Sequence, residues 1–115
     1  MGKREAAART EIPPGTLYML ILKSLARLGP MHGYGIAQHI QQLSEEVLQV
    51  EEGSLYPALQ RMLIKGWVAA EWGQSENHRR ARYYTLTPAG KKQLTAEIGE
   101  FERVMAAIGR VIQPA

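Results

Sequence analysis

The chain has 115 residues, of which 45% are hydrophobic and 22% are charged, and its formal net charge is +3 at pH 7. This length predicts one domain with a modest core, and so mild a basic charge does not by itself indicate a nucleic-acid-binding protein. The sequence has no cysteine, which excludes disulfides and thiolate chemistry. It also has no signal-peptide pattern and no apolar run long enough to span a bilayer, so we expect a cytoplasmic protein without a membrane partner.

The N-terminal part of the sequence predicts an arm followed by two helices. Residues 1–14 are polar and alanine-rich and end in two prolines, which predicts a flexible N-terminal arm. Apolar residues at helical spacing predict an amphipathic helix over residues 17–28, ended by Gly29 and Pro30. The same spacing predicts a second helix over residues 34–44. This second helix is expected to bury four apolar side chains: Ile36, Ala37, Ile40 and Leu43.

A third helix is predicted in the stretch EEGSLYPALQRMLIKGWV, residues 51–68. Its apolar side chains recur at helical spacing: Leu55, Leu59, Met62 and Leu63. Ser54 is the expected N-cap, and a helix that starts there has Pro57 in its first turn, where the missing N–H costs no helical hydrogen bond. Gly66 is expected to end the helix. The face opposite the leucines carries Pro57, Gln60, Arg61 and Ile64, flanked by Ser54 and Tyr56.

After the third helix the pattern changes from helix to strand. The runs WVAAEWG and ARYYTL are rich in aromatic and β-branched residues and predict two strands. The polar loop over residues 73–80 joins them into a hairpin. Trp67 and Trp72 are expected in the core beneath this hairpin.

A last helix is predicted to begin at Pro88, with Thr87 as its N-cap, and to reach about residue 112. Six apolar residues along it are spaced by 4, 3, 4, 3 and 4 positions: Leu94, Ile98, Phe101, Met105, Ile108 and Ile112. A helix packed only on its own domain usually shows a wider apolar stripe, whereas a narrow heptad seam favours a partner helix. The nearest candidate is the same helix of a second copy. We therefore expect a homodimer joined through Leu94, Ile98, Phe101, Met105 and Ile108.

The order of these elements predicts a mainly α fold with a two-stranded β-hairpin. Three helices followed directly by a hairpin are typical of a winged helix-turn-helix, here over residues 15–87. Residues 88–115 would then form a C-terminal dimerisation helix. In such a domain the third helix enters the major groove of DNA, and the hairpin lies along the backbone or the minor groove.

Three stretches, in this order, resemble the PadR family of bacterial transcriptional regulators: LYMLILKSLARLGPMHGYGIAQHI, EEGSLYPALQRMLIKGWV and RRARYYTLTPAGKKQL. The resemblance covers about residues 15–95, and the short C-terminal end is similar to that of the family's small subgroup. It implies a winged-helix repressor that dimerises through its last helix and binds double-stranded palindromic promoter DNA, on the bacterial nucleoid when bound. Several members release DNA on binding phenolic acids or flat aromatic drugs, so a small aromatic effector is an implied partner.

The resemblance also assigns roles to residues. The recognition-helix motif falls on Ser54, Leu55, Tyr56 and Pro57, the HGY motif on His32, Gly33 and Tyr34, and the basic residues of the hairpin on Arg79, Arg80 and Arg82. With the outer face of the third helix added, the expected DNA-binding residues are Tyr34, Ser54, Tyr56, Pro57, Gln60, Arg61, Arg79, Arg80 and Arg82.

Each expected contact has an ordinary alternative. A serine cap with a surface tyrosine and a solvated turn with arginines are common in proteins that bind no DNA. Tyr34 either donates its hydroxyl to a phosphate or packs its ring half-buried in the core. Either Gln60, which can pair with adenine, or Arg61, which can pair with guanine, reaches a base. Phe101 either stacks on a flat ligand between two subunits or belongs to the dimer seam.

Other residues exclude some functions and favour one alternative. His32, His39 and His78 lie in different elements, and no cysteine or aspartate is present to complete a metal site, so we expect no metal or other cofactor. The histidines and serines also lack the partners that catalysis requires, so no enzyme is expected. Four glutamates gather before the third helix: Glu45, Glu46, Glu51 and Glu52. They favour, as an alternative, a small-molecule-binding or protein-interaction module on a winged-helix scaffold that no longer binds DNA.

Overall fold

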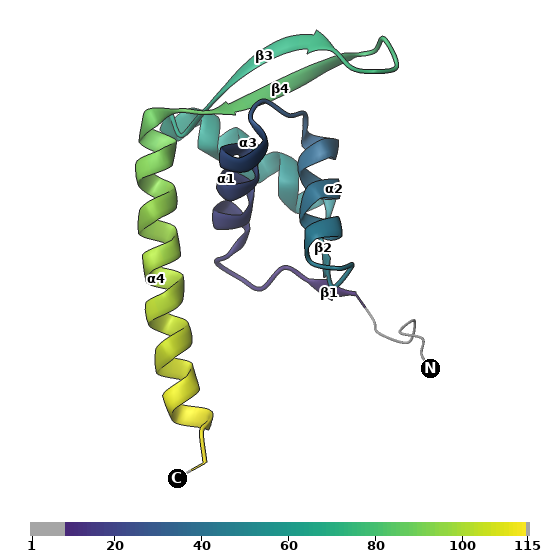
Figure 1. Ribbon diagram of the computed structural model, residues 1–115. Coiled ribbons are helices and arrows are strands. Elements are labelled where there is room, and N and C mark those ends of the chain that lie inside the picture. The colour runs from purple at the N-terminus through teal and green to yellow at the C-terminus, as the bar shows by residue number, and fades with distance from the viewer. Residues whose placement is uncertain (1–8, 115) are drawn as a thin grey trace, which may run out of the picture.

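The structure is a computed structural model that describes residues 9–114. Its elements follow in chain order as β1 (Thr10–Glu11), α1 (Leu17–Leu28), α2 (Gly33–Leu43), β2 (Leu48–Gln49), α3 (Glu52–Lys65), β3 (Val68–Gln74), β4 (Arg80–Leu86) and α4 (Pro88–Ile112). Helices α1, α2 and α3 pack beneath the hairpin of β3 and β4, and α4 runs along one side and extends beyond them (Figure 1). The predicted fold class, mainly α with a two-stranded hairpin and a C-terminal helix, is confirmed.

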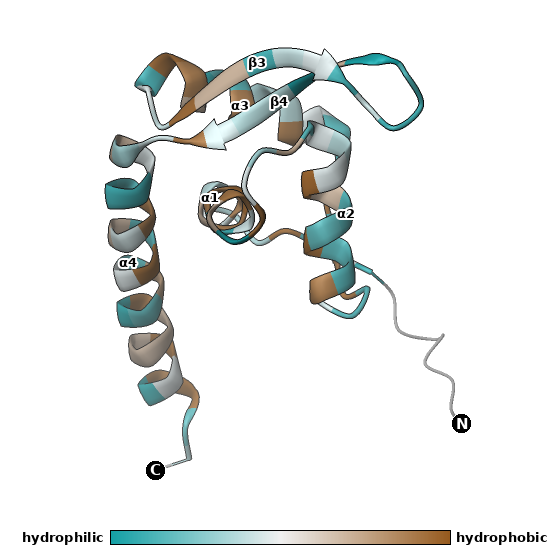
Figure 2. Ribbon diagram, turned by 45° about the horizontal axis from the view of Figure 1, so that its top comes forward, coloured by the Kyte–Doolittle hydropathy of each residue, from teal (hydrophilic) through white to brown (hydrophobic). Residues whose placement is uncertain are grey.

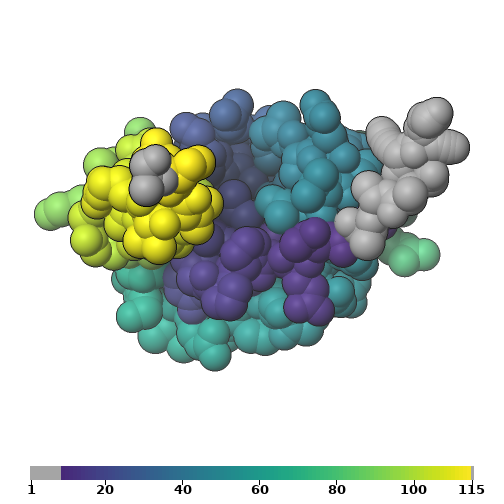
Figure 3. Space-filling view, turned by 90° about the horizontal axis from the view of Figure 1, so that it is seen from below, coloured from purple at the N-terminus to yellow at the C-terminus, as the bar shows by residue number. Residues whose placement is uncertain are grey.

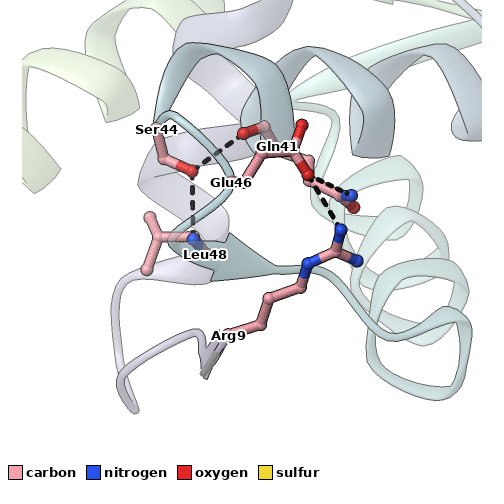
Figure 4. A network of polar contacts seen from close by, with 5 residues as sticks. All are labelled: Arg9, Gln41, Ser44, Glu46 and Leu48. Atoms are coloured by element: carbon pink, nitrogen blue, oxygen red, sulfur yellow. Dashed lines mark hydrogen bonds and ion pairs between the residues drawn. The ribbon is translucent and has the colours of Figure 1, made fainter. Parts of the chain in front are cut away.

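The segment before α1 is more ordered than the sequence indicated. β1 pairs in parallel with β2, and the amide of Thr10 donates to the carbonyl of Val47 over 2.7 Å. Arg9 forms an ion pair with Glu46 over 3.0 Å (Figure 4). This short strand lies where a flexible arm was expected. The sequence did not predict it, because two strand residues are too few to show a periodic pattern. Residues 1–8 of the expected arm lie outside the described residues.

The turn between α2 and β2 contains two consecutive non-glycine residues with left-handed backbone, Glu45 at φ 56° and Glu46 at φ 69°. Such conformations cost about 1 kcal/mol or more each, so neighbouring contacts must hold them. Gln41 donates to the Glu46 carboxylate, and the amide of Leu48 donates to the hydroxyl of Ser44, each over 3.0 Å (Figure 4). Two of the four clustered glutamates therefore shape a turn.

The core lies between α1, α2 and α3 and is closed by the base of the hairpin and the start of α4. Its buried side chains are Met19, Ile21, Leu22, Leu25, Ile36, Ile40, Leu55, Ala58, Leu59, Met62, Val68, Tyr84 and Leu94. Burial of Ile36 and Ile40 is confirmed, and Ala37 packs against the core. The predicted burial of Leu43 is wrong, since its side chain is 58% exposed. Leu43 is the last residue of α2 and lies at the rim of a surface groove against α1.

Helix α3 begins earlier than predicted, because its N-cap is Glu51 and not Ser54. The amides of Ser54 and Leu55 both donate to the carbonyl of Glu51, over 3.0 and 2.9 Å, so the helical hydrogen bonds already start there. Pro57 consequently lies in the second turn, where its missing N–H leaves the carbonyl of Gly53 without a helical partner. Gly53 is exposed, and water can satisfy this carbonyl.

The end of α3 and the start of α4 meet at one junction. Gly66 ends α3 with φ 77°, and Thr87 caps α4 by accepting from the amide of Gly90 over 3.0 Å, which confirms both predicted caps. The hydroxyl of Thr87 also donates to the carbonyl of Gly66 over 2.7 Å, and its amide donates to the carbonyl of Trp67 over 3.1 Å. These bonds fix the direction in which α4 leaves the domain.

Helix α4 spans 25 residues, and its first part packs on α1. Leu94 is 8% exposed and packs mainly within the core of its own chain, whereas its contact with a second copy stays a prediction. Ile98 also packs against that core. Heptad spacing alone does not distinguish a partner within the chain from one outside it. The apolar side of α4 continues beyond these contacts (Figure 2) and is exposed at Phe101, Met105 and Ile108. Within residues 9–114, no helix is long and apolar enough to cross a membrane.

Candidate nucleic-acid interface

The hairpin has one face directed toward the helices, which we call the inner face. β3 and β4 pair antiparallel with Trp72 opposite Arg82, and alternation along the strands puts Arg80, Arg82 and Tyr84 on one face. Tyr84 is buried in the core, which identifies this as the inner face. Toward its tip the hairpin extends past the helices (Figure 1). Trp72 is exposed, and neither it nor the two arginines belong to the core, although all three lie on the inner face.

Trp72 is 59% exposed, so its predicted place in the core is wrong. Its ring is covered by two guanidinium groups, with Cζ of Arg80 at 4.6 Å and Cζ of Arg82 at 5.8 Å from the ring centroid. The core ends along the hairpin before this position is reached, and sequence pattern does not show where that happens. Trp67, at the base of the hairpin, packs against the core edge-on to Tyr18, as expected.

A groove with a volume of 710 Å³ lies between the inner face of the hairpin, the start of α2 and one side of α3. It brings together five of the predicted DNA-binding residues: Tyr34, Tyr56, Arg79, Arg80 and Arg82. Tyr34 is 62% exposed at this groove, so the alternative of a half-buried core ring is wrong. The only acidic side chain among the groove residues that the structure describes is Glu76. The groove is therefore basic and lined with hydrogen-bond donors.

Tyr56 reaches the groove across the start of α2. A Cβ atom at Gly33 would lie 2.7 Å from both Cε1 and the hydroxyl oxygen of Tyr56, so the ring occupies space that any other residue at Gly33 would fill. Burial raises the pKa of the Tyr56 hydroxyl above its ordinary value, and the negative charge of Glu52 raises it further. Since the ordinary pKa of a tyrosine already lies far above neutral pH and the shift is upward, the hydroxyl is protonated and can donate a hydrogen bond.

His32 caps α2, a role that the sequence analysis missed. Its Nδ1 accepts from the amide of Gly35 over 3.0 Å. The ring also stacks beside Tyr34 with 6.4 Å between centroids. The HGY motif thus supplies a cap, a space for the Tyr56 ring and an exposed tyrosine. In the part of the chain that the structure describes, no three His, Cys, Asp or Glu side chains come together as metal ligands would.

The other predicted DNA-binding residues lie apart from the groove. Pro57 and Gln60 are exposed on the outer face of α3, as expected. Arg61 is directed toward α1, where its Nη1 donates to the hydroxyl of Tyr18 over 3.4 Å. Ser54 lines a different groove, formed with the segment before α1. Ser54 and Arg61 therefore do not share a surface with the hairpin arginines.

A second, largely apolar groove of 800 Å³ lies between α4 and residues 13–16, just before α1. In Figure 3, seen from below, the C-terminal part of α4 lies beside this N-terminal segment. The groove contains Phe101, Met105 and Ile108 of the predicted seam. It also contains Val104, which the sequence analysis missed although it lies three residues after Phe101, on the same side of a helix.

Comparison with known proteins gives consistent results. The model of the transcriptional regulator PadR-like family matches residues 21–96. The solved structure of a transcriptional regulator from Clostridium thermocellum is 27% identical, with a TM-score of 0.79 over 86% of this chain and 95% of that chain. A PadR family transcription regulator from Clostridium difficile is 28% identical, with a TM-score of 0.71 over 84% of this chain and 98% of that chain. A PadR family regulator from Eggerthella lenta is 26% identical, with a TM-score of 0.72 over 88% and 85%.

The family match covers most of the chain, including α2, α3, the hairpin and the first part of α4. It confirms the resemblance that the three sequence motifs indicated, and it agrees with a winged-helix domain whose hairpin carries a basic, exposed inner face. The chain belongs to the transcriptional regulator PadR-like family of DNA-binding proteins.

Proposed function

We propose that this protein is a sequence-specific DNA-binding repressor that acts as a homodimer on an inverted-repeat operator. The observation that carries the proposal is the basic groove beneath the hairpin, which gathers three arginines and two tyrosines beside the exposed face of α3. Arginine and tyrosine side chains donate to phosphate oxygens, which only accept hydrogen bonds. The arginines and Tyr34 therefore suit one strand of the sugar–phosphate backbone, whereas Tyr56, on the α3 side of the groove, would lie beside the bases that α3 reads.

In this proposal, α3 enters the major groove with its outer face toward the bases. Pro57 would contact the apolar edges of bases, and Gln60 can pair bidentately with adenine. Arg79, Arg80 and Arg82 would neutralise phosphates from the hairpin, and most of the affinity would come from these contacts. With DNA as its ligand, the protein would act in the bacterial cytoplasm, and the repressor role is what the family resemblance implies.

The glutamate cluster does not favour the alternative of a winged helix that no longer binds DNA. Glu46 is paired with Arg9, at the far end of α2 from the hairpin. Glu51 and Glu52 lie at the N-terminal end of α3, where negative charge stabilises a helix. These glutamates therefore have structural roles, and their presence does not argue against DNA binding.

The direct test is selection from a pool of random-sequence duplexes. We expect enrichment of an inverted repeat whose half-sites are centred about one helical turn, roughly 34 Å, apart. Binding should weaken steeply as salt is raised, because each neutralised phosphate releases a counterion. No enriched sequence together with a flat salt response would contradict the proposal and favour the small-molecule or protein-interaction alternative.

The dimer is proposed to form through the exposed part of α4. Phe101 is 37% exposed, and Met105 and Ile108 are each 45% exposed, on one side of a helix that extends beyond the domain. Monomeric proteins rarely leave so continuous an apolar strip in water. A small aromatic effector, as the resemblance implies, would bind in the apolar groove beside Phe101 and act on the same interface.

Charged residues in this strip are expected to separate the two copies. The double change Met105→Glu and Ile108→Glu places charges where the second helix would pack, and burying unpaired charges costs several kcal/mol. Light scattering should give the mass of one chain instead of two, and selection should no longer enrich an inverted repeat. Ala106→Glu, which is exposed on another side of α4, is the control and should leave the dimer intact. A dimer that survives the double change would place the interface elsewhere.

Alanine at Gly33 is expected to reduce sequence preference by displacing Tyr56. The new Cβ would lie 2.7 Å from the tyrosine ring, which must move away. Base contacts contribute about 1–3 kcal/mol each, so binding to the selected operator should weaken roughly ten-fold while binding to random duplex changes little. The control is Gly35→Ala, whose Cβ comes closest to the flexible end of Met31, at 3.0 Å, and otherwise makes ordinary contacts of 3.4 and 3.5 Å with the His32 ring. Fluorescence anisotropy measures the ratio of affinities for the selected operator and for random duplex. If this ratio is the same in both variants, Tyr56 does not read sequence.

A further inference from the structure

The large aromatic side chain of Trp72 lies outside the core, in the groove that the hairpin forms with the start of α2. Burial does not explain it, because more than half of its surface is exposed. Its neighbours on the inner face are two arginines, Arg82 directly across the ladder and Arg80 two residues earlier on β4. Both guanidinium groups lie over its ring, and all three side chains line the basic groove.

Stacking on a ring restrains an arginine without using its hydrogen bonds. A guanidinium group stacks through its flat face, and its N–H groups point outward in the plane of the group, where they remain free to donate. A long arginine side chain in water samples many rotamers, and fixing it on binding opposes association. Arg80 and Arg82 are thus already restrained before any ligand arrives.

The charge of these arginines is also left available. The ion pairs among residues 9–114 join Arg9 to Glu46 and Arg103 to Glu100, and neither involves the hairpin. Arg80 and Arg82 are therefore held by an aromatic ring in place of a carboxylate within the described part of the chain. A carboxylate partner would compete with phosphate for the same N–H groups, whereas a ring does not.

We propose that Trp72 is a positioning residue for DNA binding, which holds Arg80 and Arg82 over the groove so that both donate to phosphates of one strand. This inference rests on the proposed DNA-binding function. It assigns a role to a residue that touches no base, so the effect is independent of DNA sequence and concerns the number of phosphates neutralised.

The test compares Trp72→Leu with Trp72→Phe. Leucine keeps apolar bulk on the strand but has no ring face, whereas phenylalanine keeps a ring on which arginine can stack. The probe is a fluorescein-labelled 30-base-pair duplex of random sequence, titrated by anisotropy at several NaCl concentrations. We expect Trp72→Leu to bind about five-fold more weakly, with a log–log salt slope shallower by about one. Trp72→Phe should retain most of the affinity and the slope of the unaltered protein.

Three results would overturn this role for Trp72. These are an unchanged affinity of Trp72→Leu, a loss of its affinity at an unchanged salt slope, and an equal loss of affinity in both variants. A loss of affinity at an unchanged salt slope would show that the arginines still reach phosphates. An equal loss in both variants would show that the bulk of the tryptophan matters and not its stacking. Melting curves of both variants check that the fold is kept, which the exposure of Trp72 predicts. If the unaltered protein binds no duplex even at low salt, the proposed function fails together with this inference.

Discussion

Replacing Gly90 by alanine is expected to destabilise the protein by about 3 kcal/mol or more, at the upper end of what overpacking usually costs. Gly90 lies in the first turn of α4, and a Cβ atom there would be 2.1 Å from the carbonyl oxygen of Trp67 and 2.7 Å from Cδ1 of Leu86. That carbonyl accepts from the amide of Thr87, so α4 cannot move away without breaking the junction. Since domains of this size are stable by only about 5–15 kcal/mol, much of the stability would be lost.

Urea unfolding, followed by circular dichroism at a fixed protein concentration, measures this effect as a lower midpoint. The matched control is Gly99→Ala, also in α4, where a Cβ meets no atom within 4 Å. That change should raise the free energy of unfolding by about 1 kcal/mol, because alanine favours a helix over glycine. Two variants that shift the midpoint in the same direction would contradict the close approach at Gly90.

Removing Arg80 and Arg82 together is expected to weaken DNA binding about 100-fold for each subunit bound, if each phosphate contact contributes about 1.4 kcal/mol. The loss should be the same for the selected operator and for random duplex, because phosphate contacts carry no sequence information. The log–log salt slope should become shallower by about two for each subunit bound, since two fewer counterions are released. Anisotropy titrations at several salt concentrations measure both quantities.

The control removes the same charge from another part of the chain. Arg103→Ala with Arg110→Ala changes α4, where Arg103 is paired with Glu100 and the helix extends away from the hairpin (Figure 1). This variant should keep most of the affinity, once light scattering shows that it is still a dimer. If both double variants weaken binding to the same extent, net charge and not the position of the hairpin arginines determines affinity.

The helices and the hairpin could be predicted from the sequence because their signals are local. Apolar residues that recur about every 3.6 positions indicate α1 to α4. Gly66 marks the end of α3, and Thr87 and Pro88 mark the start of α4. The start of α3 could not, because Ser54 is a good cap by residue type, whereas the backbone bonds to Glu51 decide where the helix begins. The strand at residues 10–11 was missed for a related reason, since it depends on a partner far away in the chain.

The candidate site was predicted where a motif marks it and missed where packing decides. The hairpin arginines and Tyr56 were expected, and they do share a groove. Trp72 was assigned to the core, because residue type does not show how far the core extends along a hairpin. Leu94 was assigned to the dimer, because the heptad pattern is the same whether the helix packs on α1 or on a second chain. The space that Gly33 leaves for a ring is likewise visible only in three dimensions.

The junction at Thr87 links α3, the helix that we propose reads DNA, to the long helix α4, through its hydrogen bonds to the carbonyls of Gly66 and Trp67. In a dimer joined through α4, a tilt of one α4 helix against the other would therefore also move the α3 helix that is bonded to it. A small rotation at the subunit boundary would alter the span between the two α3 helices while each domain keeps its shape. A ligand lodged between the long helices could thus control operator affinity from a distance, without touching a residue that meets DNA.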